Sequence, residues 1–183
     1  STGKLFPLMI LNTGITTTLG DNLTFMASKV ITLTLNGNSL DLNGKTISGN
    51  SAINRVLIRS NTIGTARTIT ISLGSADAAD FRDITASAAW DISGATNFTG
   101  DAGGNTNITF TTAATQTYTG GADNWSTAAR WTSRVPLPQD DVDFGSSSTA
   151  TTLTFDMPRP GRNLNAANYL KTLSFASVAN TIT

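Results

Sequence analysis

The sequence lacks several residue types on which most familiar active sites depend. It has no cysteine and no histidine, and all 12 of its acidic residues are aspartate, with no glutamate. Without cysteine there is no disulfide, no thiolate nucleophile and no zinc–thiolate site, and without histidine there is no imidazole base or ligand. No cofactor is therefore expected, apart from the calcium ion considered below.

Charge is scarce and evenly balanced. Only 13% of the residues are charged, and 12 lysines and arginines match the 12 aspartates. A nucleic-acid-binding surface needs a concentration of basic residues, so nucleic acid is not expected as a partner. The longest apolar run, residues 5–11, contains Pro7 and is far shorter than the ~20 residues of a membrane-spanning helix. Membrane insertion is therefore not predicted.

The residues that are abundant favour strands and turns. Threonine favours strands, whereas asparagine and glycine favour turns. In residues 30–49, Ile31, Leu33 and Leu35 alternate with threonines, and Asn36-Gly37 provides a turn before two further short strand-like segments. Three short strands with tight corners in so few residues are typical of one coil of a β-solenoid.

We therefore predict an all-β chain built as a right-handed parallel β-helix (β-solenoid), with short loops and little or no helix. The hydrophobic pattern indicates coils of roughly 20 to 30 residues with unequal loops. Leu57 is predicted to lie on the opposite face of its strand from its two apolar neighbours. The side chains predicted to point inward are Ile31, Leu33, Leu35, Leu42, Val56, Ile58, Ile69 and Ile71.

The character of the sequence changes near Tyr118, which indicates a boundary between two modules. Beyond it lie Trp125 and Trp131, two prolines and a run of aspartates. We predict a β-helix domain over residues 1–115, beginning with an N-terminal cap or first coil. A second β-helical module is predicted over residues 116–183, and its strand-like end suggests that this module is truncated.

Several segments resemble a known class of protein. In the first module they are Leu-Asn-Gly-Lys-Thr-Ile-Ser-Gly at residues 42–49, Asp-Ile-Thr-Ala at 83–86 and Gly-Gly-Asn-Thr-Asn-Ile-Thr-Phe at 103–110. In the second they are Asn-Trp-Ser at 124–126, Trp131, Val-Pro at 135–136 and Asp-Asp-Val-Asp-Phe at 140–144. These segments resemble right-handed parallel β-helix repeat proteins of phage virions, fibre-like or tail-like, and of bacterial surface proteins. The resemblance implies a fold and a location on a virion, outside the cell or on its surface, and it implies no catalytic residue.

Asp140, Asp141 and Asp143 form the densest acidic cluster and are the candidate metal ligands. Carboxylate oxygens are the ligands that calcium prefers, but calcium needs six to eight of them and the EF-hand spacing is absent. The alternative is a solvated turn after Pro138, in which aspartate accepts backbone hydrogen bonds. This structural role is the favoured interpretation.

Trp125 and Trp131 are the candidates for stacking on a sugar ring. An aromatic face with polar neighbours suits the apolar face of a carbohydrate. The alternative, which we favour, is that both side chains fill the core or seal the junction between modules. No residue is assigned a catalytic role on this basis.

The function predicted from these features is structural or adhesive: a component of a virion fibre or tail, or of an extracellular filament, with glycan binding as an added role. The alternative is a carbohydrate-active enzyme of the tailspike kind, a glycosidase or polysaccharide lyase. Its acid and base would have to be aspartates, with Asp41, Asp80, Asp83 and Asp91 as candidates.

Self-assembly is also expected from the ends of the chain. Residues 5–11 are apolar and residues 173–182 are strand-like; neither segment carries a charge, and Pro7 is the single proline in the two that could protect a sheet edge. The expected partners are further copies of the chain or other subunits of a virion or filament, together with cell-surface glycans.

Overall fold

The computed structural model describes residues 16–18, 20–25, 29–33, 39–70, 74–121, 123–144, 152–157, 161–165 and 172–174. Within them the chain is all-β, with strands β1 to β18 and one short 3-10 helix, η1 (Ala128–Arg130). The chain divides into two compact units, residues 1–112 (unit 1) and 113–183 (unit 2), close to the predicted boundary. In the described part, no helix has the length and apolar character needed to cross a membrane.

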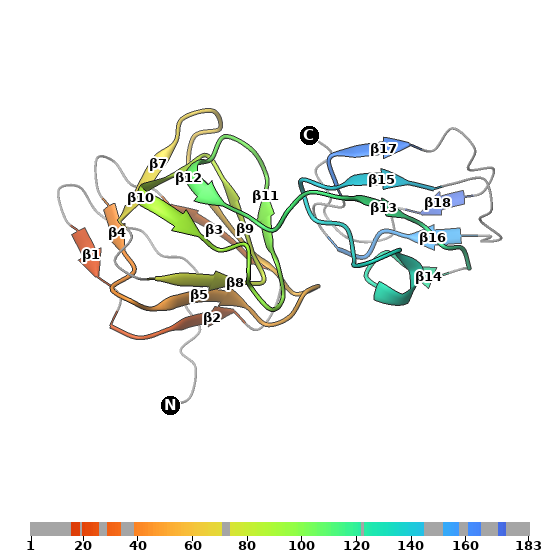
Figure 1. Cartoon of the computed structure of the whole chain (residues 1–183), viewed down its shortest axis with the longest axis horizontal. Coiled ribbons are helices and arrows are strands. Elements are labelled where there is room, and N and C mark those ends of the chain that lie inside the picture. The colour runs from red at the N-terminus through yellow and green to blue at the C-terminus, as the bar shows by residue number, and fades with distance from the viewer. Residues whose placement is uncertain are drawn as a thin grey trace. The chain divides into compact units, whose positions relative to one another are not determined.

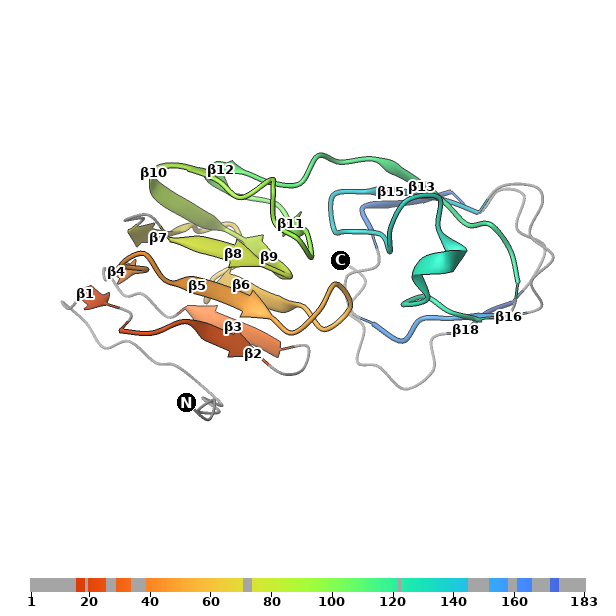
Figure 2. The ribbon, with the colours of Figure 1, turned by 60° about the horizontal axis from the view of Figure 1, so that its bottom comes forward.

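Unit 1 contains three parallel sheets (Figure 1). The first has the order β1 (Thr16–Thr18), β4 (Ser39–Asp41), β7 (Arg67–Thr70), β10 (Ile84–Asp91) and β12 (Thr106–Thr109). The second has the order β3 (Lys29–Leu33), β6 (Val56–Ser60), β9 (Ala79–Arg82) and β11 (Thr99–Asp101). The third contains β2 (Leu23–Phe25), β5 (Thr46–Gly49) and β8 (Ser75–Asp77), which lie as successive rungs in Figure 2.

Unit 2 contains two parallel sheets of three strands each. One has the order β13 (Thr115–Thr117), β15 (Asp141–Asp143) and β17 (Asn163–Asn165). The other has the order β14 (Asp123–Asn124), β16 (Thr152–Thr154) and β18 (Thr172–Ser174). The chain alternates between these two sheets, so each strand pairs with the next strand but one in the sequence.

Strands in unit 1 visit the three sheets in rotation. From β1 to β9 the chain passes through the first, third and second sheets three times in the same order. Strand partners lie roughly 20 to 30 positions apart: Thr16 pairs with Ser39, and Thr46 pairs with Ser75. Because the chain returns to each sheet in the same direction, the pairing stays parallel although the loops differ in length.

Single residues turn the chain between sheets at two corners of unit 1. Ala78, with φ of 46°, separates β8 from β9, and Asp83, with φ of 55°, separates β9 from β10. One residue in the left-handed region redirects a strand without a loop. Such corners place consecutive strands in different sheets. Aspartate tolerates this region better than most residues, whereas alanine at position 78 is not a residue expected there.

Four of the predicted core residues are confirmed. Leu42, Val56 and Ile69 are 0% exposed and Ile58 is 1% exposed. All four belong to one hydrophobic cluster, which also contains Phe81 and Trp90 in edge-to-face contact. The side chains of Ile31 and Leu33 are not described, and Leu35 and Ile71 lie outside the described residues.

Strand β6 is buried on both faces, which its sequence pattern did not specify. Leu57 does alternate with Val56 and Ile58, but it is only 8% exposed, so both faces of this strand are buried. On the Leu57 face, its strand partner Asp80 is also buried, as is Arg55 just before the strand. Parallel strands are commonly covered on both faces, and a two-residue period does not show which strands these are.

Replacing Gly74 with alanine is expected to destabilise unit 1 by about 1 to 3 kcal/mol. An added Cβ would lie 2.5 Å from Cβ of Leu42, so one of the two segments must move. The carbonyl of Gly74 also accepts a hydrogen bond from Nε1 of Trp90, at 2.7 Å, which restrains that movement. The urea midpoint of unfolding measures the effect.

Gly94→Ala is the matched control. Apart from Gly94 and its two chain neighbours, no described residue has a heavy atom within 4 Å of the position that the added Cβ would take. It should therefore leave the midpoint close to that of the wild type, and an equal loss in both variants would contradict the packing explanation.

Candidate functional site

One sheet of unit 2 presents a regular polar face. Its three strands have the same pattern, in which a central residue points inward and its two neighbours point outward. Thr115, Asp141 and Asn163 are in register across the sheet, and so are Thr117, Asp143 and Asn165. The inward column contains Gln116, at 0% exposure, and Val142, at 1%.

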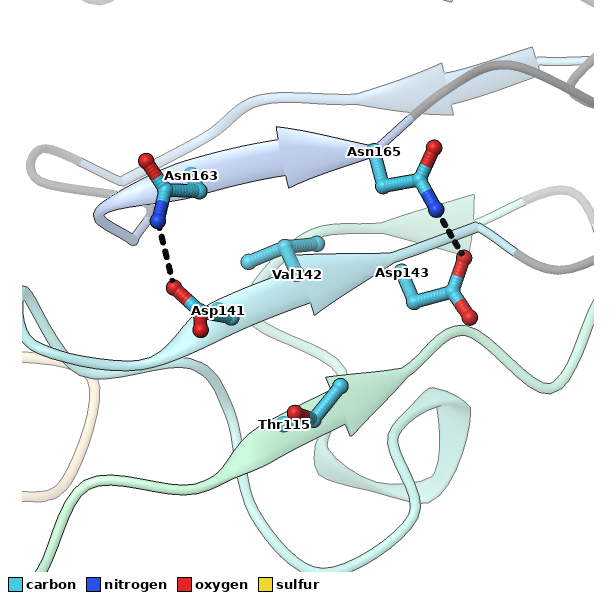
Figure 3. Close-up of a pocket in the computed structure, with 6 residues that line it drawn as sticks. All are labelled: Thr115, Asp141, Val142, Asp143, Asn163 and Asn165. Atoms are coloured by element: carbon cyan, nitrogen blue, oxygen red, sulfur yellow. Dashed lines mark hydrogen bonds between the residues drawn. The ribbon is translucent and has the colours of Figure 1, made fainter.

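This polar face contains a shallow pocket of about 290 Å³. It is lined by Thr115, Asp141, Val142, Asp143, Asn163 and Asn165, from all three strands (Figure 3). The two carboxylates and two amides therefore share one surface, although they come from segments far apart in the sequence. Hydroxyl, carboxylate and amide groups together can both donate and accept hydrogen bonds.

Hydrogen bonds between neighbouring strands hold the carboxylates in place. Nδ2 of Asn163 donates to Asp141 at 2.8 Å, and Nδ2 of Asn165 donates to Asp143 at 3.3 Å (Figure 3). Arg162 also donates to both carboxylate oxygens of Asp141, at 3.0 and 3.1 Å. The hydrogen bond from Asn163, followed by those from Arg162, lowers the pKa of Asp141 below its ordinary value of 3.8.

Asn163→Ala is expected to raise the pKa of Asp141 toward its ordinary value. The amide stabilises the ionised carboxylate, so its loss favours the protonated form. Because the pKa is lowered in the folded protein, this carboxylate favours the folded state above about pH 4, and the contribution is lost as the pH falls through the folded-state pKa. An NMR titration of the carboxyl carbon measures the shift.

Asn165→Ala controls for general disturbance of the sheet. Its amide bonds to Asp143, so the pKa of Asp141 should not change. Equal shifts in the two variants would contradict the assignment of the lowered pKa to Asn163.

Asp140 does not share this surface with Asp141 and Asp143. It is 0% exposed, its two oxygens accept from Arg134 at 2.6 and 3.2 Å, and backbone amides of Ala114 and Leu137 donate to it at 2.8 and 2.9 Å. Among the described residues, no three acidic side chains are grouped so that they could hold a metal ion. Asp140 is therefore separated from the other two candidate ligands; as in the favoured interpretation it accepts backbone hydrogen bonds, but it is buried rather than solvated.

Trp125 and Trp131 are core residues in this structure. They are 0% and 4% exposed, and their ring centroids lie 4.5 Å apart. Trp125 also stacks on Phe155, while Trp131 contacts Tyr118 edge to face. With no exposed ring face, neither side chain is positioned to stack on a sugar.

The four aspartates considered for catalysis in unit 1 are each engaged by neighbouring groups of the fold. Asp80 forms a buried ion pair with Arg55, and Oδ2 of Asp83 accepts the backbone N–H of Gly64 at 2.9 Å. Asp41 and Asp91 make equivalent turns, each accepting a backbone N–H two residues later at 3.0 Å. All four thus have local structural partners.

Comparison with protein-family models, curated proteins and solved structures finds no match to this chain. The site is therefore interpreted from its geometry. Thr115, Asn163 and Asn165 were missed in the sequence, because only the pairing of three distant strands places them beside Asp141 and Asp143. The shared polar–central–polar pattern of the three strands was the available signal.

Proposed function

We propose that this chain is a structural and adhesive segment of an extracellular filament or of a virion fibre or tail. In this proposal both units are right-handed parallel β-helices, and the polar face of unit 2 contacts glycans. The observation that carries it is the rotation of β1 to β9 through three parallel sheets. A chain that returns repeatedly to the same sheets forms a stack that lengthens with every coil, which suits an extended scaffold.

The pocket on unit 2 supports the adhesive part of the proposal. Asp141, Asp143 and Asn163 offer fixed acceptors and donors on a rigid sheet, and sugar hydroxyls need both. The pocket is shallow and without an exposed aromatic ring among its lining residues. Weak contacts of this kind become effective when many copies are displayed together on a fibre.

The enzyme alternative has one observation in its favour and one against it. Asp141 and Asp143 are two positions apart on one strand, about 6.6 Å along the backbone, near the lower limit of carboxyl separation in inverting glycosidases. A general acid, however, needs a raised pKa, and the pKa of Asp141 is lowered by its hydrogen bonds. Asp141 is therefore unsuited to the role of general acid, and we favour binding over hydrolysis.

Immunogold labelling tests the proposed location. Antibodies raised against the chain should label filaments, the cell surface or the fibres and tails of virus particles from the source organism, with pre-immune serum as the control. Label confined to the cell interior, away from particles and surfaces, would overturn the proposal.

A turnover assay on surface polysaccharides separates the binding function from the enzyme alternative. We expect glycans to be retained by the immobilised protein without release of reducing ends, and Asp141→Asn with Asp143→Asn to reduce that retention. Release of reducing ends that these two substitutions abolish would support the enzyme instead.

A further inference from the structure

The inward column of the unit 2 sheet is open at one end. Gln116 and Val142 are 0% and 1% exposed, but Leu164, which is in register with Val142, is 43% exposed. Its neighbours Asn163 and Asn165 are exposed as well. Among the described strands, β17 pairs only with β15. Leu164 is thus the exposed position of a column whose other two members are buried.

The sequence of β17 is symmetrical about Leu164. It reads Asn-Leu-Asn, so a second copy placed antiparallel across a two-fold axis puts Leu164 against Leu164 and Asn163 against Asn165. In this arrangement the two leucine side chains face each other and the asparagine amides face each other. The strand itself carries no charge. Such self-complementary contacts are the requirement of a two-fold interface, the commonest symmetry of soluble oligomers.

We propose that the edge at β17 is an interface through which two copies of this chain pair antiparallel about Leu164. The pairing would cover the exposed leucine, and primary amides can donate and accept across the axis. It rests on the proposed role in assembly and identifies one contact by which copies join. A three-residue strand is a small contact, so the association is weak and is best detected at high protein concentration.

Disulfide trapping tests this pairing directly, because the wild-type chain has no cysteine. In antiparallel pairs, directly opposed Cα atoms lie about 4.5 to 5.5 Å apart, within the range that a disulfide spans. Leu164→Cys should therefore form a covalent dimer under mild oxidation. Ile63→Cys is the matched control, since Ile63 is the other large exposed hydrophobic residue among those described, at 61%. We expect dimer formation by Leu164→Cys to be at least about tenfold faster than by Ile63→Cys.

The asparagines determine the orientation of the two strands. In the proposed pairing, Asn163 of one copy opposes Asn165 of the other, whereas the two Asn163 residues are roughly 8 Å apart. Asn163→Cys alone should therefore cross-link slowly, and a mixture of Asn163→Cys with Asn165→Cys should cross-link quickly. Fast self-linking by Asn163→Cys, or equal rates for Leu164→Cys and Ile63→Cys, would overturn the pairing.

Sedimentation velocity of the full chain up to about 100 µM gives an independent measurement. Leu164→Asp should weaken self-association at least about tenfold and Ile63→Asp should not, since a buried aspartate is costly and an exposed one is not. Two checks exclude misfolding as the cause of weaker association by Leu164→Asp. One is the near-UV circular dichroism of that variant, and the other is the milder substitution Leu164→Thr. Wild-type protein that shows no self-association, or association that Leu164→Asp leaves unchanged, would overturn the inference. The location found by immunogold labelling would still support or contradict the proposed function separately.

Discussion

Trp125→Ala is expected to lower the free energy of unfolding of unit 2 by about 3 to 5 kcal/mol. Trp125 is 0% exposed, and its ring centroid lies 4.3 Å from that of Phe155 and 4.5 Å from that of Trp131. Phe144 is also in contact, at 6.0 Å. Removing the indole leaves a large cavity at the centre of this cluster, and a small unit has few other core residues to close it.

Denaturant unfolding followed by tryptophan fluorescence and near-UV circular dichroism measures this loss. Trp125→Phe should cost much less than Trp125→Ala. It keeps an aromatic ring, and it removes a buried indole Nε1 that has no hydrogen-bond partner among the described residues. Trp131→Phe is the comparison and should cost more than Trp125→Phe. In the wild type, Nε1 of Trp131 donates to the carbonyl of Trp125 at 2.8 Å, and this buried acceptor would lose its donor. An unfolding transition unchanged in Trp125→Ala would contradict the central position assigned to this ring.

The alternation of apolar and polar residues carried much of the information about unit 1. It identified Leu42, Val56, Ile58 and Ile69 as core residues, because a period of two follows directly from strand geometry. It did not show that Leu57 is buried as well, since burial of a second face depends on what packs over it. Alternation thus describes a strand, whereas the cover over its outer face comes from the rest of the chain.

The candidate site shows a different limit of the sequence. Asp140, Asp141 and Asp143 look like one cluster, but the same alternation sends Asp140 away from the other two, and this could have been read from the sequence. The pairing of Asn163 with Asp141 could not, because the loops between these strands are unequal and no local pattern fixes their register. Local chemistry was therefore predictable, and the assembly of the site was not.

Asp80→Ala is expected to lower the free energy of unfolding of unit 1 by about 3 to 5 kcal/mol. Oδ1 of Asp80 accepts hydrogen bonds from Nε and Nη2 of Arg55 at 2.8 and 2.6 Å, and the two side chains are 1% and 2% exposed. Without Asp80 the guanidinium is left buried with no opposite charge, and desolvation of that charge is no longer offset. The loss therefore comes from the cation that remains, rather than from the hydrogen bonds removed.

The position of Arg55 makes this effect a test of how neighbouring strands are joined. Its guanidinium also donates to the carbonyl groups of Ala79, Asn97 and Phe98, so it links β6 to β9 and to the turn before β11. Replacing both partners, as in Arg55→Met with Asp80→Leu, removes the unpaired charge but leaves these carbonyls without their donor. The double variant should thus regain part of the stability that Asp80→Ala loses, and not all of it.

The exposed pair formed by Arg162 and Asp141 is the matched control for this buried pair. Its side chains are 57% and 41% exposed, and water already screens their attraction. Arg162→Ala should leave the urea midpoint close to that of the wild type, while Asp80→Ala shifts it strongly. Similar small shifts in both would mean that water reaches the Arg55–Asp80 pair. Full recovery in the double variant would mean that the three carbonyl groups find other donors, and that Arg55 does not join these strands.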